Sequence, residues 1–311
     1  MSDSAPKTSE GGRLFVVGCG YIGSAVVAGA VEKGWRVTAL TRNADKAARL
    51  KATYRIEVIV ADLDSSEWHD RISADGVSVV NCVSSGGGGV EGYRKSYYEG
   101  MTSLLDWAKK GAVRCLVYTS STSVYPDSDG GWLNEQGPTA PSTPMNEVLV
   151  ETEDLIAEAV GSGDLSSGAV MRLAGIYGPG RHYLLDMLRE GVDKIPGVGD
   201  YYLNLIHRDD AARAILRALE KRKRGYTVWN LADGSPSLKE DIVAWAAKRL
   251  NVPMPVFSPE LVTERMQRRL FANGRPPNRR IAAQKIRDEL DWEPAHPSFA
   301  SGYEAIIRAG F

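Results

Sequence analysis

The chain has 311 residues, 43% of them hydrophobic and 25% charged, with a formal net charge of −1 at pH 7. This composition is typical of a globular protein, the charge would not recruit nucleic acid, and no apolar run approaches the ~20 residues that span a bilayer. We therefore expect a cytoplasmic protein with neither a nucleic-acid nor a membrane partner, acting as a monomer or homodimer. The three cysteines show no metal-ligand spacing, so no metal site is expected.

Short apolar stretches alternate with helical segments along the first half of the chain. Residues 1–12, rich in Ser, Gly and Lys, are expected to form a disordered leader. Strands are then expected at 13–17, 35–41, 56–61, 77–83, 113–119 and 168–173, separated by helices at 21–33, 45–51, 93–110 and 145–160. Such alternation predicts an α/β fold of the Rossmann type, with a doubly wound parallel sheet.

After residue 175 the pattern becomes less regular. We expect a strand at 227–231 and helices at 184–191, 209–221, 238–250, 259–271 and 281–290. The predicted organisation is a dinucleotide-binding domain over 13–175, to which 203–232 return, and a smaller C-terminal substrate-binding lobe made of 176–202 and 233–311.

A glycine-rich turn separates the first strand from the first helix, with the sequence Gly18-Cys19-Gly20-Tyr21-Ile22-Gly23. In a G-x-G-x-x-G motif the first glycine makes the tight turn, the second lets the backbone approach a pyrophosphate, and the third allows close helix packing. The N-terminus of the helix adds N–H groups and a partial positive charge. The turn predicts a dinucleotide site that includes Tyr21 and Ile22.

The end of the second strand indicates which dinucleotide is bound. An acidic residue there would bind the ribose 2′-hydroxyl of NAD, but the chain reads Thr41-Arg42-Asn43. Arg42 can offer its guanidinium to the 2′-phosphate of NADP, with Thr41 and Asn43 as supporting donors. NADP is therefore expected and NAD remains possible; the alternative is that Arg42 is a solvated loop residue.

The segment 116–125 (LVYTSSTSVY) resembles the fifth strand and active-site serine segment of extended short-chain dehydrogenases/reductases, in the NAD-dependent epimerase/dehydratase superfamily. The segments 172–180 (RLAGIYGPG), 205–210 and 285–292 also resemble that superfamily, most of all its YeeZ-like bacterial branch. The resemblance implies the Rossmann fold and further cofactor contacts at Asp62, Leu63, Val83, Ser84, Thr119 and Leu173.

One departure from the family concerns its proton relay. Family enzymes carry Tyr-x-x-x-Lys on the helix after the serine, where Lys lowers the tyrosine pKa for proton exchange with the substrate. At the matching positions this chain has Met145 and Leu149, with Glu153 where the family has a later Glu. The helix face that would hold the relay therefore presents apolar side chains.

Substitutes for the relay are few. Ser121 matches the catalytic serine and could hydrogen-bond a carbonyl oxygen, while Tyr125 or His182 could transfer the proton. The alternatives are that Tyr125 serves packing or substrate contact and that His182 is a satisfied loop histidine. Tyr97 and Tyr98 lie early in a helix expected to line the cofactor site, with aromatic packing as their default role. His207 and the pair Asp209–Asp210 are expected to cap and orient the next helix.

The sequence favours an atypical extended short-chain dehydrogenase/reductase that binds NADP(H) in a cleft between its two lobes. Its substrate would be a small polar molecule, such as a sugar derivative or a carbonyl compound, and its reaction that of an oxidoreductase or an epimerase/dehydratase-like enzyme. The alternative function is a redox sensor or scaffold that binds the dinucleotide without turnover, which the missing Tyr/Lys pair would explain.

Overall fold

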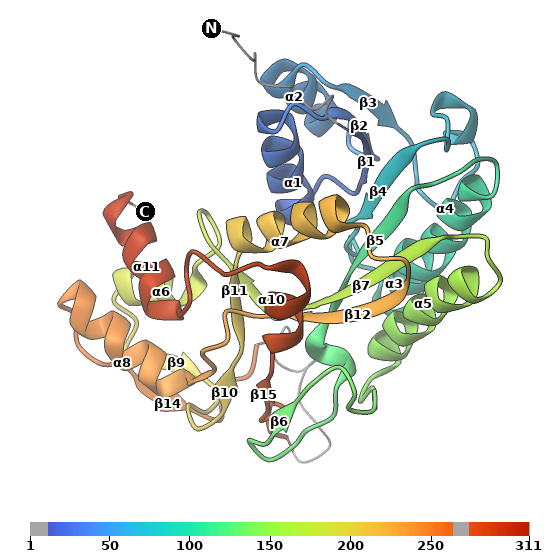
Figure 1. Ribbon diagram of the computed structural model, residues 1–311. Helices are drawn as coiled ribbons and strands as arrows, with labels where there is room; N and C mark the ends of the chain where they lie inside the picture. The colour runs from blue at the N-terminus through green and yellow to red at the C-terminus, as the bar shows by residue number, and fades with distance from the viewer. Residues whose placement is uncertain (1–11, 264–273, 311) are drawn as a thin grey trace, which may run out of the picture. The chain divides into compact units, whose positions relative to one another are not determined.

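The computed structural model describes residues 12–263 and 274–310. A seven-stranded sheet has the order β12-β7-β5-β4-β1-β2-β3, and its register is parallel at β1–β2, β1–β4, β2–β3 and β4–β5 (Figure 1). The strands are β1 (Arg13–Val17), β2 (Arg36–Thr41), β3 (Glu57–Val60), β4 (Val77–Asn81), β5 (Cys115–Ser121), β7 (Ser167–Leu173) and β12 (Gly225–Leu231). The strand order reverses between β1 and β4, so the doubly wound parallel sheet expected from the sequence is confirmed.

Helices connect the strands of this sheet much as the alternating pattern predicts. They are α1 (Tyr21–Glu32), α2 (Ala44–Tyr54), α3 (Gly89–Tyr93), α4 (Gly100–Ala108), α5 (Pro144–Gly161) and α7 (Arg208–Lys221). The single helix expected over 93–110 is instead interrupted: the π-helical turn η2 (Arg94–Glu99) lies between α3 and α4. A π turn adds a residue without changing the apolar character of a segment, so hydrophobic periodicity gave no sign of it.

Contacts between residues divide the chain into two compact units. The first unit comprises the chain up to Thr119 together with Glu151–Val170 and Ala212–Thr227; the second comprises Ser120–Val150, Met171–Ala211 and Val228–Phe311. The expected dinucleotide-binding domain had included residues 120–150, which these contacts assign to the second unit. Strands β5, β7 and β12 each begin in the first unit and end in the second.

The core of the first unit contains three large aromatic side chains. The ring of Phe15 on β1 lies 5.5 Å from that of Trp68 and 5.3 Å from that of Trp107 on α4, and all three residues are fully buried. The indole N–H groups donate to backbone carbonyl groups, as buried indoles require. The free cysteines Cys19, Cys82 and Cys115 are also buried, as expected for reduced thiols.

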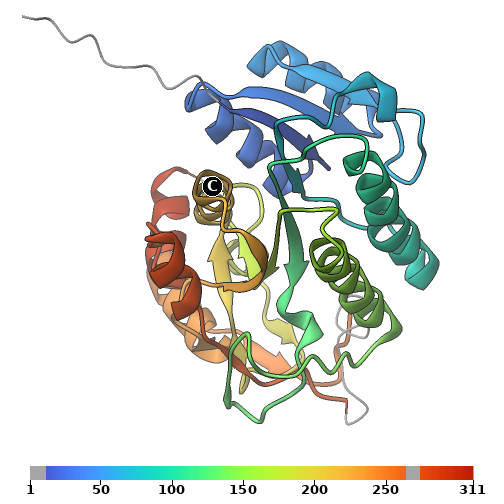
Figure 2. The same ribbon diagram turned by 45° about the vertical axis from the view of Figure 1, so that its right-hand side comes forward.

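Helices cover both faces of the sheet in the first unit (Figures 1 and 2). On one face α1 lies beside α7, where Lys33 and Glu220 form an ion pair of 2.8 Å. On the other face α4 and α5 lie side by side, and Arg94 of η2 forms an ion pair of 2.8 Å with Glu151 of α5. Both faces of the strands are therefore buried, as their near-continuous apolar sequences predict.

The second unit contains short elements around its own apolar core. They are η3 (Thr122–Val124), β6 (Trp132–Leu133), β8 (Gly175–Tyr177), α6 (Tyr183–Arg189), β9 (Lys194–Pro196), β10 (Tyr202–Leu203), β11 (Leu205–His207), β13 (Ser237–Leu238), α8 (Lys239–Leu250), β14 (Val256–Ser258), β15 (Arg280–Ile281), α10 (Gln284–Leu290) and α11 (Phe299–Arg308). Its core packs apolar residues of α6, α8 and α11 together.

Some helices differ from the sequence predictions or cannot be compared with them. Helix α11 was not predicted, although the Ser298 capping box that begins it is a local signal. Most of the helix expected over 259–271, like nearly all of the leader, lies outside the described residues. Among the helices that the structure describes, none is both long and apolar enough to cross a membrane.

Candidate dinucleotide site and catalytic residues

The three glycines of the turn after β1 are each required for a different reason. Gly18 has φ +82°, and a Cβ there would come within 2.6 Å of the Val83 backbone nitrogen. A Cβ at Gly23 would overlap the carbonyl oxygen of Gly18. Gly20 differs, because a Cβ there would meet no protein atom within 4 Å. Glycine at position 20 is thus not needed for packing, and the open space beside it is where a ligand can approach the backbone.

A dinucleotide pyrophosphate fits this turn. Gly20 is the N-cap of α1 and makes no side-chain capping bond, and the first backbone bond of the helix runs from Ser24 N to Gly20 O over 3.0 Å. In the first turn of any α-helix the backbone N–H groups lack a carbonyl acceptor of the same helix. Those of α1 lie beside the open space at Gly20 and carry the positive end of the helix dipole, which suits an anion.

Arg42 is exposed directly after β2 and lies against Gly86, in the loop that follows β4. A Cβ at position 86 would overlap the Arg42 guanidinium, so glycine is what lets this side chain extend across the loop. The neighbouring side chains shape the start of α2: Asn43 Oδ1 accepts a bond from Lys46 N over 2.7 Å, and Thr41 Oγ1 accepts one from Asn43 N over 3.3 Å. The Thr41 hydroxyl and the Asn43 amide keep their N–H or O–H groups as donors.

Most of the other predicted cofactor contacts follow the carboxyl ends of β3 and β4, whereas Thr119 and Leu173 lie within strands. Val83 and Ser84 follow β4, beside Gly18. Asp62 is exposed after β3, whereas Leu63 is 8% exposed and its side chain faces Gly100 of α4. The remaining two residues form hydrogen bonds to distant parts of the chain. The Thr119 hydroxyl donates to Asn81 O, and the carbonyl of buried Leu173, in the second unit, accepts a bond from the Thr122 hydroxyl.

Ser121 ends β5 and caps the short helix η3. Its hydroxyl oxygen accepts a bond from Ser123 N over 3.1 Å, which leaves the hydroxyl hydrogen able to donate to a substrate oxygen. Ser123 Oγ in turn donates to Asn146 Oδ1 over 3.0 Å, so the start of α5 lies against the serine turn. Met145 and Leu149 are on that part of α5, Leu149 being buried. The helix turn next to the serine segment therefore carries apolar side chains, as the sequence indicates.

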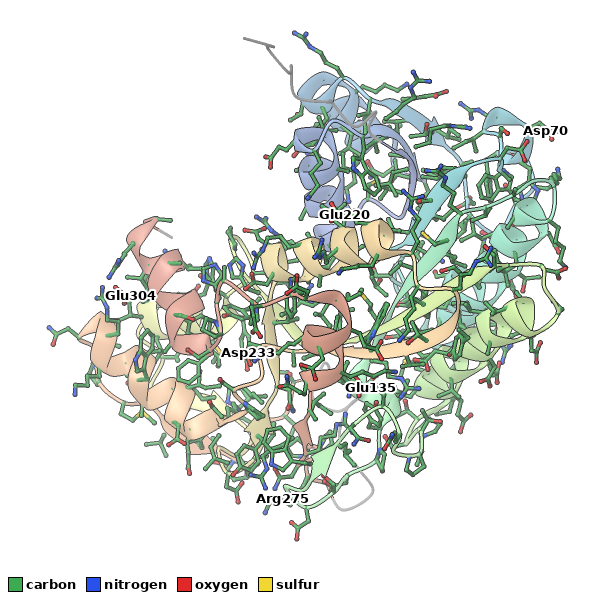
Figure 3. All side chains as sticks on the ribbon, in the orientation of Figure 1. Asp70, Glu135, Glu220, Asp233, Arg275 and Glu304 are labelled. Carbon is green, nitrogen blue, oxygen red and sulfur yellow. The ribbon has the colours of Figure 1, made fainter. Side chains whose placement is uncertain are left out.

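Tyr125 is fully buried in a polar network of the second unit. Its hydroxyl donates to Asn230 Oδ1 over 2.9 Å and accepts a bond from Arg172 Nη1 over 2.9 Å, with the Arg172 guanidinium over its ring. Asn230 is held by Glu135, which accepts its backbone N–H over 2.7 Å (Figure 3). Burial also raises the pKa of Tyr125. These contacts favour the packing role that the sequence left open and disfavour proton transfer by Tyr125.

The histidines of the second unit have local partners. His182 is 8% exposed and directly precedes α6. Its Nδ1 atom lies 3.1 Å from a carboxylate oxygen of Asp186, which is in the first turn of that helix. The ligand-type atoms of His207, Asp210 and His296 lie within 4.8 Å of one another. Asp210 accepts the backbone N–H groups of Ala295 and His296, and His207 Nδ1 accepts that of Asp209. Such contacts favour the orienting role expected for this segment.

A cluster in the first unit was not identified from the sequence as a site. Tyr97 on η2 accepts a bond from Ser85 N over 3.3 Å, and Tyr118 on β5 is fully buried and within electrostatic range of Tyr97, Tyr93 and Glu153. Glu153 is itself 2% exposed. These residues come from three separate segments, so sequence spacing does not group them. Only the expectation that the helix predicted over 93–110 lines the cofactor site indicated Tyr97.

Comparison with known proteins shows the family of this chain. The model of the NAD dependent epimerase/dehydratase family matches residues 14–232, and the chain belongs to that family. It is 29% identical over 251 residues to Protein YeeZ of Escherichia coli K12, which covers 79% of this chain and 86% of that protein. It is also 27% identical over 313 residues to the 3-diazoavenalumate denitrifying reductase of a Streptomyces species, which covers 93% and 98%.

A solved structure supports the same fold. MoeE5 in complex with UDP-glucuronic acid and NAD has a TM-score of 0.80 and 20% identity, covering 96% of this chain and 100% of that one. At that identity the likeness concerns the fold alone. The family match by itself makes this chain a relative of NAD-dependent epimerases and dehydratases.

Proposed function

We propose that this protein is an NADP(H)-dependent oxidoreductase that acts on the carbonyl or alcohol group of a small polar molecule, such as a sugar derivative. The position of Arg42 carries the proposal. This residue follows β2, where a carboxylate would select NAD, and its guanidinium lies against Gly86 in the loop after β4. The described residues give Arg42 no carboxylate partner. A 2′-phosphate would supply one through charge-assisted hydrogen bonds.

The residues that would hold the dinucleotide follow from the geometry of the first unit. The turn from Gly18 to Gly23 would bind the pyrophosphate, Arg42 the 2′-phosphate, and Val83 with Ser84 the remainder of the molecule. The bound nicotinamide would supply or accept a hydride. Ser121 would donate its hydroxyl hydrogen to the reacting oxygen of the substrate and so polarise it.

Two relatives guide the substrate class. One is a reductase by its description, and the MoeE5 structure contains a sugar nucleotide. The test is to measure the binding of NADPH and NADH by calorimetry, and then to follow the absorbance of the reduced cofactor at 340 nm with a panel of sugar nucleotides, aldehydes and ketones. Tighter binding of NADPH and oxidation of it by one compound would support the proposal; tighter binding of NADH would overturn the cofactor assignment.

A second candidate function is a dinucleotide sensor or scaffold without turnover. It is favoured by the apolar side chains Met145 and Leu149 beside the serine turn and by the burial of Tyr125, which together leave the usual relay without a proton donor. The same panel discriminates the two, because a sensor binds NADPH but oxidises it with no member of the panel.

A further inference from the structure

An oxidoreductase needs a group that exchanges a proton with the substrate oxygen. The assignment of this group rests on the proposed function. The positions of the family's Tyr and Lys carry Met145 and Leu149, and the hydroxyl hydrogen of Tyr125 is donated to Asn230. A titratable group elsewhere must then do this work. Among the described residues of the first unit, which holds the glycine turn and Arg42, Tyr97 lies in a suitable place.

Tyr97 places its hydroxyl at the carboxyl end of β4. The hydroxyl oxygen accepts a bond from Ser85 N over 3.3 Å, and Ser85 lies two residues after Val83, against which Gly18 packs. Tyr97 therefore lies at the same edge of the sheet as the glycine turn. Because the oxygen serves as acceptor and no acceptor for the hydroxyl hydrogen is found among the described residues, that hydrogen can be donated to a ligand.

The backbone around Tyr97 also departs from regular structure. Residues Arg94–Glu99 form a π-helical turn between α3 and α4. The extra residue of a π turn rotates the side chains that follow it, and such turns are frequent at functional sites. Tyr97 is on this turn and is half-buried, with the Tyr93 ring packed at 5.1 Å. The turn thus holds the tyrosine in a fixed position while leaving part of it accessible.

Tyr118 on β5 is a further tyrosine of the first unit, and its titration is influenced by Tyr97. Tyr118 is 0% exposed, and its hydroxyl has no hydrogen-bond partner among the described residues. A buried hydroxyl without a partner destabilises the fold, and such groups call for an explanation. Burial, with further contributions from Tyr97 and Glu153, raises the pKa of Tyr118 well above its usual value, so this hydroxyl keeps its hydrogen.

We propose that Tyr97 is the proton-transfer residue of this protein, in the place of the family's Tyr-x-x-x-Lys pair. In the reduction, the carbonyl carbon of the substrate gains the hydride that NADPH supplies, the carbon–oxygen π bond breaks, and the oxygen takes the phenolic proton of Tyr97. The phenolate then regains a proton from water. In the oxidation, the phenolate takes the proton of the alcohol as the hydride leaves.

The surroundings of Tyr97 favour reduction. Burial, with a further contribution from Tyr93, raises the pKa of Tyr97 to about 12, so the group is a phenol near neutral pH. The cluster of Tyr93, Tyr97, Tyr118 and Glu153 holds no lysine that would lower it. Tyr97 is therefore ready to donate a proton, whereas as a base it would need the positive charge of the oxidised nicotinamide beside it.

The test reads the charge around Tyr97 directly. A fluorinated tyrosine of lower pKa is placed at position 97, or at position 98 as the matched control, and its titration is followed by fluorine NMR in the presence of NADP⁺ or NADPH. Beside the positive nicotinamide the midpoint at position 97 should be lower with NADP⁺ than with NADPH, by about one pH unit. The midpoint at position 98 should be the same with both. Equal midpoints at position 97, with both cofactors bound by calorimetry, would overturn the proposal.

Activity provides the second readout. With a compound of the panel that the protein reduces, Tyr97→Phe should lower kcat by roughly 10²–10⁴ with little change in KM or in cofactor affinity. Tyr98→Phe should retain kcat. Full kcat in Tyr97→Phe would exclude proton transfer by Tyr97 while leaving the oxidoreductase function intact. Failure of the unmodified protein to bind either dinucleotide would instead overturn the proposed function itself.

Discussion

The hydroxyl of Tyr125 donates a hydrogen bond of 2.9 Å to the side chain of Asn230, 105 residues further along the chain. Arg172 donates a second bond of 2.9 Å to the same hydroxyl. Tyr125 follows Ser121 by four residues, which made it a candidate for proton transfer. Its hydrogen bonds within the second unit instead indicate that it holds three segments of the unit together.

We expect Tyr125→Phe to lower the free energy of unfolding by about 1–3 kcal/mol, because buried Asn230 and Arg172 each lose a partner. Urea denaturation measures this loss. Turnover of any compound that the protein reduces should persist in the folded variant, and Tyr98→Phe serves as a control for loss of a less buried hydroxyl. Unchanged stability together with lost turnover would restore Tyr125 as a proton donor.

The glycine turn offers a pair of variants that separate binding from folding. Gly20→Val should still fold, because a Cβ at position 20 would meet no atom of the described residues, its chain neighbours apart, within 4 Å, yet it should abolish dinucleotide binding in calorimetry. Gly23→Ala should instead lower the thermal midpoint, because its Cβ would overlap the carbonyl of Gly18. A folded Gly20→Val protein with normal affinity would contradict the placement of the pyrophosphate.

Selection of the phosphate by Arg42 is tested by the ratio of two affinities. Arg42→Ala should weaken NADPH binding by about 1.5–3 kcal/mol and leave NADH binding nearly unchanged, since only NADPH carries the 2′-phosphate. Arg49→Ala removes the same charge from an exposed position of α2. It controls for the effect of a lost positive charge on cofactor binding through the overall electrostatic potential. Equal losses for both cofactors in Arg42→Ala would remove its role in selection.

Asp233 predicts how stability depends on pH. The carboxyl group is 1% exposed after β12 (Figure 3), and burial raises its pKa to about 7, against 3.8 in the unfolded chain. The folded protein thus binds the proton more tightly, so this stabilisation is complete below about pH 4 and is lost as the pH rises to about 7.

Asp233→Asn should remove this part of the pH dependence. The decline in unfolding free energy between about pH 4 and pH 8 should shrink by up to roughly 4 kcal/mol. Exposed Asp241 provides the control variant Asp241→Asn, for which no such change is expected. An undiminished decline in Asp233→Asn would mean that the carboxyl group is ionised in the folded protein at neutral pH.

Local sequence determined the first βαβ unit, the glycine turn and the parallel sheet, because these depend on residues close together in the chain: apolar strands, the glycines at 18, 20 and 23, and the residue at position 42. The sequence also predicts that Met145 and Leu149 stand at the positions of the family's Tyr and Lys. Periodicity and spacing report such features because neighbouring residues alone set them.

The tertiary structure decided what single side chains do. Tyr125 is held by Asn230 and Arg172, and Tyr97 accepts a bond from Ser85, through segments that no spacing rule connects. The same is true of the buried Tyr118 hydroxyl, which has no hydrogen-bond partner in the described part of the chain. The π turn that carries Tyr97 has the same apolar pattern as an ordinary helix, so only the backbone reveals it. A hydroxyl becomes structural or chemical according to the acceptors that folding brings to it, and these come from distant parts of the chain.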